Sequence, residues 1–169
     1  MTLPTTPSQT VGPFFSFGLC DRPSADIVPP GTAGSVGVAG RVFDGAGDPV
    51  PDAMVELWQA DSEGRYRGDF GWGRCGTDDG GRYAFTTVKP GRVDGQAPHL
   101  VVLVFARGLL RPVLTRMYFP DEAEANAGDA TLQSVRADER ATLVARARDD
   151  GLEFDVNLQG DRQTVFFAL

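Results

Sequence analysis

Histidine is nearly absent from this chain: His99 is the only one in 169 residues. Neutral imidazole is the commonest protein ligand for transition metals, and imidazole-rich iron or zinc sites use two or three of them. One histidine cannot build such a site alone. Two interpretations of His99 are open: a hydrogen-bonded core histidine at the start of a strand, which its setting favours, or a metal ligand.

Cysteine and lysine are also scarce. The two cysteines, Cys20 and Cys75, lack the C-x-x-C spacing of a zinc or redox pair, so we expect free thiols in a reducing compartment. Lysine is almost absent, arginine carries the positive charge, and the net charge is −7. Nucleic acids and anionic membranes require clustered cations, so neither is an expected partner.

No apolar run reaches the length of a membrane span, and the first residues lack the basic and apolar regions of a secretory leader. We therefore expect a cytoplasmic protein. The sequence also lacks a phosphate-binding glycine loop and a G-x-S-x-G elbow. Its length suits one domain, residues 1–169, with a sizeable core.

Glycine and proline are abundant, with 21 and 12 residues spread between short apolar segments. This rhythm is typical of an all-β fold, an antiparallel β-sandwich. Weak helical patterns predict two short helices outside the sheets, at 121–127 and, more weakly, at 137–148. The expected strands cover 36–43, 53–60, 82–88, 99–106, 114–119, 152–158 and 164–167.

Residues 1–35 are rich in proline, threonine, serine and glycine and contain the aromatic cluster 14–17. The segment is too apolar for a disordered tail and too broken for a regular element. We expect an ordered N-terminal arm that packs on another surface. The cluster 14–17 and the apolar C-terminal residues 165–169 could face a partner or pack into the chain's own core.

Two side chains stand out as candidates for binding. Arg107 ends the apolar strand that His99 begins, and its guanidinium suits a carboxylate ligand, although a surface salt bridge is an equal alternative. Tyr66 lies in a glycine-rich loop, where its phenol could be functional or could simply pack. The carboxylate pairs at 61/63 and 78/79 are interpreted as turn formers and solvated charges.

A series of segments in linear order resembles the intradiol aromatic-ring dioxygenases, specifically the iron-free subunit of the two-subunit members. The resemblance covers nearly the whole chain. The segments that match the family are residues 6–15, 40–44, 55–61, 64–66, 77–83, 87–91, 97–99, 105–108, 116–119, 121–127 and 163–167.

The resemblance implies an α/β hetero-oligomer of homologous sandwiches in which the beta subunit alone binds Fe(III), through two tyrosines, two histidines and a hydroxide. Tyr66 and His99 match the first tyrosine and the first histidine. Val93 stands where the second tyrosine is expected, and Val101 stands where the second histidine is expected. Gln96 replaces an arginine near the substrate. Tyr66 and His99 are then vestigial, and we expect no metal and no catalytic residue in this chain.

The resemblance also implies that the arm lines the partner's substrate pocket, with Thr10, Gly12 and Pro13 at the matching positions. Glycine permits close backbone approach and proline keeps a turn rigid. Arg107 matches a substrate-associated arginine. The implied reaction cleaves 3,4-dihydroxybenzoate with O₂ between its hydroxylated carbons, giving 3-carboxy-cis,cis-muconate in the β-ketoadipate pathway of aromatic catabolism.

Two rival functions remain. A transthyretin-like β-sandwich could act as a stand-alone binding module without catalysis. A complete single-chain dioxygenase would need four protein ligands for its iron, and one histidine excludes the family's arrangement.

Overall fold

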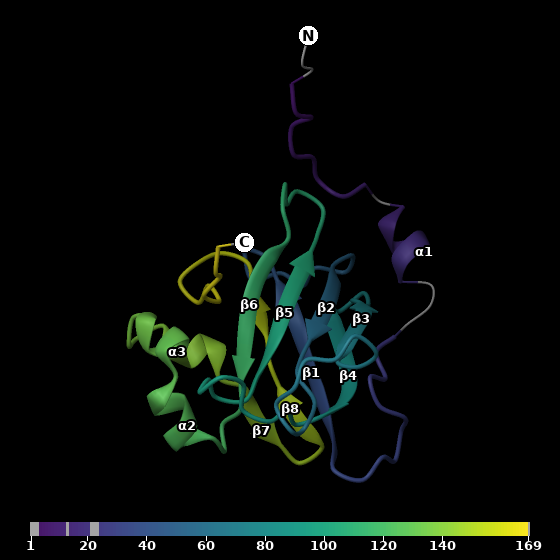
Figure 1. Ribbon diagram of the computed structural model, residues 1–169. Helices are drawn as coiled ribbons and strands as arrows, with labels where there is room; N and C mark the ends of the chain where they lie inside the picture. The colour runs from purple at the N-terminus through teal and green to yellow at the C-terminus, as the bar shows by residue number, and fades with distance from the viewer. Residues whose placement is uncertain (1–3, 13, 21–23, 169) are drawn as a thin grey trace.

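The computed structural model describes residues 4–12, 14–20 and 24–168, and two β-sheets packed face to face dominate it (Figure 1). The expected all-β sandwich is confirmed. One sheet has the strand order β4-β1-β8-β7, with β9 also pairing with β1, and the other has the order β3-β2-β5-β6. The strands are β1 (Ser35–Phe43), β2 (Met54–Trp58), β3 (Trp72–Gly76), β4 (Arg82–Val88), β5 (His99–Phe105), β6 (Val113–Tyr118), β7 (Arg146–Arg148), β8 (Gly151–Glu153) and β9 (Val156–Asn157).

The first sheet is mixed, which the sequence did not indicate. β1 pairs antiparallel with β4, whereas β8 and β9 run parallel to β1. Parallel strands need a long connection between them, and here the whole second sheet and the helices that follow β6 lie between β1 and β8 in the chain. The second sheet is antiparallel throughout its described pairs.

Alternation along β5 separates the core from the outer face of the second sheet. Leu100, Val102 and Val104 are buried between the sheets, in the same cluster as Val38 and Phe85 of the first sheet. Side chains in a strand alternate between faces, so His99 and Val101 lie on the opposite, outer face. His99 and Val101, the two positions matched to the family's histidines, therefore share the outer face of β5.

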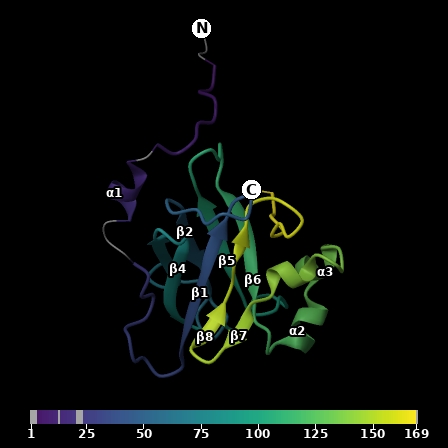
Figure 2. The ribbon, with the colours of Figure 1, turned by 180° about the vertical axis from the view of Figure 1, so that it is seen from behind.

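Short helices pack beside β6. The helices α2 (Ala123–Gly128) and α3 (Ala130–Ser134) and the 3₁₀ turn η1 (Arg140–Leu143) contribute to a second cluster that contains Tyr118 and Leu132 (Figures 1 and 2). The helix expected at 121–127 is observed as α2. The prediction of a helix at 137–148 is wrong, because this segment contains only the short turn η1, and its last three residues form β7, which pairs with β8.

Three strand predictions need correction. β3 was missed, the expected strand 152–158 divides into β8 and β9, and 164–167 forms only an isolated bridge between Phe167 and Leu114. Phe166 packs against the main core and Phe167 against the second cluster. The C-terminal phenylalanines thus pack on this chain itself, while Leu169 lies outside the described residues.

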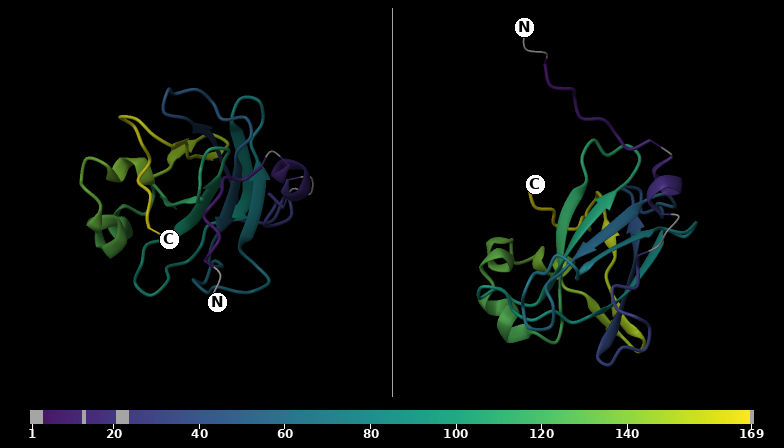
Figure 3. Two further views of the ribbon diagram at one scale, coloured as in Figure 1. Left: turned by 90° about the horizontal axis from the view of Figure 1, so that it is seen from above. Right: turned by 45° about the vertical axis from the view of Figure 1, so that its right-hand side comes forward.

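The N-terminal segment begins away from the sandwich, runs toward it and then forms the short helix α1 (Phe15–Leu19) (Figure 3). The backbone of residues 24–28 is tied to this chain's own sheet, since the amide of Ile27 donates to the carbonyl of Thr86 at 2.9 Å. No disulfide joins Cys20 and Cys75. Within the described parts of the chain, no helix is long and apolar enough to cross a membrane.

Candidate functional site

The arm meets the loop between β5 and β6. The backbone amide of Gly108 donates a hydrogen bond of 2.7 Å to Oγ1 of Thr10. Gly12 follows on an exposed stretch, and its carbonyl accepts a bond of 3.2 Å from the amide of Phe15 at the start of α1. Pro13, the third predicted arm residue, lies outside the described residues.

Apolar contact accompanies this hydrogen bond. Gln9 and Val11 line one side of a small pocket of about 110 Å³, and the β5–β6 loop lines the other with Leu109, Leu110 and Pro112. In Figures 1 and 3 the arm passes over the tip of this loop. The structure therefore places Thr10 beside the loop that carries Arg107.

Arg107 begins the loop, two residues after β5. Its Nε forms an ion pair with the carboxylate of Asp52, and the Arg107 side chain is 60% exposed. In the structure of the single chain, Arg107 therefore forms the surface salt bridge that was one of its two interpretations. Exposed ion pairs contribute at most about 1 kcal/mol, so the guanidinium can still exchange this partner for a ligand carboxylate.

Tyr66 and His99 lie far from that loop, at the other end of β5. His99 and Arg107 are separated by about 25 Å along an extended strand. The ring of Tyr66 stacks on Trp58 at 6.5 Å, and Trp58 is paired with Val101 of β5. The predicted residues therefore form two groups, one with the arm and one on the outer face where β5 begins.

His99 is buried, and its Nδ1 is 2.8 Å from the carbonyl of Ala97. Burial lowers the pKa of His99 below its usual value, and the positive charge of Arg116 acts in the same direction. Burial also raises the pKa of Tyr66. Both groups are thereby held in their neutral forms near neutral pH.

Arg116 is the site residue that sequence reasoning missed. It lies opposite Val101 in the β5–β6 pairing, and its Nη1 donates a hydrogen bond of 2.7 Å to Oε1 of Gln96. Its charge also lowers the pKa of Tyr66, against the effect of burial. A guanidinium is permanently charged. The face that carries Tyr66 and His99 therefore also carries the permanent positive charge of Arg116.

This face does not fit a ferric ion. Val93 and Val101 offer no lone pair, which leaves two of the four donors that the family arrangement needs, and Arg116 repels a second cation. Elsewhere in the described residues, no group of three or more histidine, cysteine, aspartate or glutamate side chains could hold a metal.

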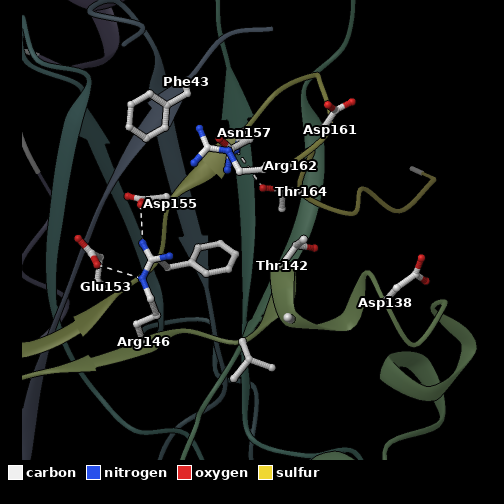
Figure 4. Close-up of a pocket in the computed structure, with 13 residues that line it drawn as sticks. Phe43, Asp138, Thr142, Arg146, Glu153, Asp155, Asn157, Asp161, Arg162 and Thr164 are labelled. Atoms are coloured by element: carbon white, nitrogen blue, oxygen red, sulfur yellow. Dashed lines mark hydrogen bonds and ion pairs between the residues drawn. The ribbon is translucent and has the colours of Figure 1, made fainter. Parts of the chain in front are cut away.

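A separate polar cavity of about 450 Å³ lies near β9 and η1 (Figure 4). Arg146 on its wall is bound by two carboxylates, Glu153 at 3.1 Å and Asp155 at 2.6 Å. The described lining does not include Thr10 or Arg107. This cavity is therefore distinct from both groups of predicted residues.

Known proteins match both the sequence and the fold. A family model described as a dioxygenase matches residues 22–160. The protocatechuate 3,4-dioxygenase alpha chain of Burkholderia cepacia is 44% identical, over 98% of each chain. The beta chain of the same enzyme from that organism is 35% identical, over 73% of this chain and 63% of its own. The dioxygenase domain of a carbohydrate-binding fusion protein from Streptomyces sp. SirexAA-E superposes with a TM-score of 0.67 at 27% identity, covering 92% of this chain and 99% of that domain.

The sandwich and these matches define a β-sandwich oxygenase. The chain belongs to the intradiol dioxygenase family. Members of this family use iron.

Proposed function

We propose that this chain is the alpha subunit, without iron, of a protocatechuate 3,4-dioxygenase. A homologous beta subunit holds the Fe(III). The complex inserts both atoms of O₂ into protocatechuate, breaks the bond between the hydroxylated carbons and yields 3-carboxy-cis,cis-muconate. The reaction belongs to the β-ketoadipate pathway. The absence of a disulfide between Cys20 and Cys75 fits the reducing cytoplasm in which we place the complex.

One observation carries the proposal: the face of Tyr66 and His99 also carries Val101 and Arg116, and Arg116 is bonded to Gln96 at 2.7 Å. Because valines replace two of the four donors and a fixed cation lies beside the other two, we infer that another chain holds the iron. The full-length match to an alpha chain supports the same conclusion, because the matched beta chain aligns over only 73% of this chain.

In the proposed complex this chain shapes the substrate pocket and does not react. Thr10, Gly12 and Pro13 form a wall against the aromatic ring, and Arg107 exchanges Asp52 for the substrate carboxylate. Holding the ring in one orientation and keeping water out raise the rate without a covalent step from this chain. We treat residues 1–169 as one domain whose first residues reach the partner.

The separation of the two groups supports this division of labour. The end of β5 with Thr10 and Arg107 carries binding groups and an exposed arm, whereas the vestigial group lies at the opposite end. The pocket beside the arm is only about 110 Å³, so an aromatic acid held there would need walls from a second chain as well.

Co-expression with an intradiol dioxygenase beta chain tests the proposal. We expect an equimolar, iron-containing complex on size-exclusion chromatography that consumes O₂ and protocatechuate in equal amounts. Each chain expressed separately is the control, and we expect this chain alone to self-associate or to be poorly soluble. A monodisperse monomer that forms no complex and leaves the beta chain's activity unchanged would refute it.

A further inference from the structure

The β5–β6 loop, residues 106–112, contacts the arm through one backbone group and one apolar surface. The hydrogen bond from Gly108 N to Thr10 Oγ1 spans 98 residues of sequence. Gln9 and Val11 line a small pocket together with apolar side chains of the same loop, including Leu110, which is 62% exposed. The arm thus rests on the loop before any partner is present.

The loop itself is anchored to the sandwich at several points. Arg107 forms its ion pair with Asp52, and the amide of Leu109 closes a turn on the carbonyl of Ala106 at 3.2 Å. The side chain of Leu109 packs against the main core. Gly108, at φ +89°, occupies the turn position that glycine favours. The amide that binds Thr10 is therefore presented by a fixed turn.

We infer that the β5–β6 loop is the positioning element of the arm, and that Thr10 acts by holding the arm on Gly108. This rests on the proposed function, because it assigns the purpose of the contact to the substrate pocket of the complex. Thr10 is then a positioning residue for Gly12 and its neighbours. Arg107 and the arm share one support, so the carboxylate-binding group and the wall of the pocket are placed by the same turn.

The strength of the hydrogen bond between Gly108 and Thr10 depends on its exposure to solvent. Thr10 and Gly108 are exposed in the chain alone, where a neutral hydrogen bond competes with water. A partner subunit covering the loop would remove that water and strengthen the bond. The arm is therefore expected to be held loosely before assembly and firmly afterwards.

The test compares Thr10→Val, which has a similar shape but no hydroxyl, with Thr10→Ser, which keeps the acceptor. Thr6→Val is the matched control, because Thr6 is an exposed arm residue for which the described structure contains no hydrogen bond. Each variant is purified in the complex. KM and kcat for protocatechuate and hydrogen–deuterium exchange of the arm and of the Gly108 amide are measured, the exchange without substrate.

We expect Thr10→Val to raise KM about three- to tenfold with little change in kcat, and to speed exchange at the Gly108 amide and in residues 8–12. Thr6→Val should match the unaltered chain in both measurements, and Thr10→Ser should match it in exchange. A raised KM with unchanged exchange would overturn the inference, because Thr10 would then contact substrate without holding the arm. Unchanged KM and exchange would overturn it as well.

The exchange measurement separates this inference from the proposed function. If no active complex forms with any beta chain, the proposed function fails, and the exchange comparison is made on the full chain alone. Faster exchange in Thr10→Val but not in Thr10→Ser would then still establish that the loop holds the arm. Equal exchange in the two variants would reject the holding role.

Discussion

The guanidinium of Arg116 donates a hydrogen bond of 2.7 Å to the side-chain amide oxygen of Gln96, on the face that carries His99 and Val101. The pair joins β6 to the turn that also contains Val93. A charge fixed in this way opposes the binding of a cation between Tyr66 and His99.

Restoring the missing donors should therefore be insufficient for metal binding. We expect the double variant Val93→Tyr, Val101→His to bind iron weakly, and the addition of Arg116→Gln to increase its affinity at least about tenfold, because a permanent cation is removed. Titration with iron, followed by the tyrosinate absorption band, checks this. Equal affinity with and without Arg116 would show that the guanidinium does not oppose the metal.

His99 should make the stability of the chain depend on pH. Its pKa is lower in the folded chain than the usual 6.5, so the unfolded chain takes up the proton more readily. The stabilising contribution is complete above pH about 6.5 and is lost as the pH falls through the folded pKa, by at most about 1.4 kcal/mol per pH unit.

Denaturant unfolding at about pH 7.5 and about pH 5.5 measures this dependence. His99→Asn keeps a donor for the Ala97 carbonyl but cannot titrate, so it should show a smaller loss between the two values. An identical loss in the variant and the unaltered chain would assign the pH dependence to other groups.

The arm should affect the kinetics with substrate and leave the iron site of the complex unchanged. Deleting residues 1–14 is expected to raise KM or lower kcat for protocatechuate in the complex, while the visible spectrum of the resting complex stays nearly unchanged. The deletion removes Thr10 and Gly12, which lie at the opposite end of β5 from the vestigial group. Unaltered kinetics in a verified complex would show that the arm is only structural.

Arg107→Ala should weaken protocatechuate binding by about 1.5–3 kcal/mol, the scale of a charge-assisted hydrogen bond. Catechol lacks the carboxylate and should lose much less. Arg111→Ala, an exposed arginine of the same loop, is the control and should change neither substrate. Equal losses for protocatechuate and catechol would instead indicate a folding or interface role for Arg107.

Local patterns predicted much of the fold. The strand expected at 82–88 is observed as β4 with the same bounds, because Arg82, Ala84 and Tyr83, Phe85 alternate between exposed and buried positions. β3 was missed because glycines interrupt its short sequence. The weak helical signal at 137–148 failed because Arg146 pairs with Glu153 of β8, and tertiary pairing outweighs the helical preference of alanine and arginine.

The candidate site was predictable residue by residue but not in its arrangement. The positions of His99 and Arg107 at opposite ends of one strand follow from the length of the apolar run. Arg116 could not be recognised in the same way. Its role depends on the register that places it opposite Val101, and nothing local in the sequence encodes that register.

The iron content of the purified complex addresses the division between the two subunits. We expect about one iron for each pair of alpha and beta chains, and a colourless alpha chain without stoichiometric iron when it is purified alone. Elemental analysis with the visible absorption spectrum provides both values. Two irons per pair, or an isolated alpha chain with stoichiometric iron and a tyrosinate charge-transfer band, would contradict the assignment of the iron to the partner.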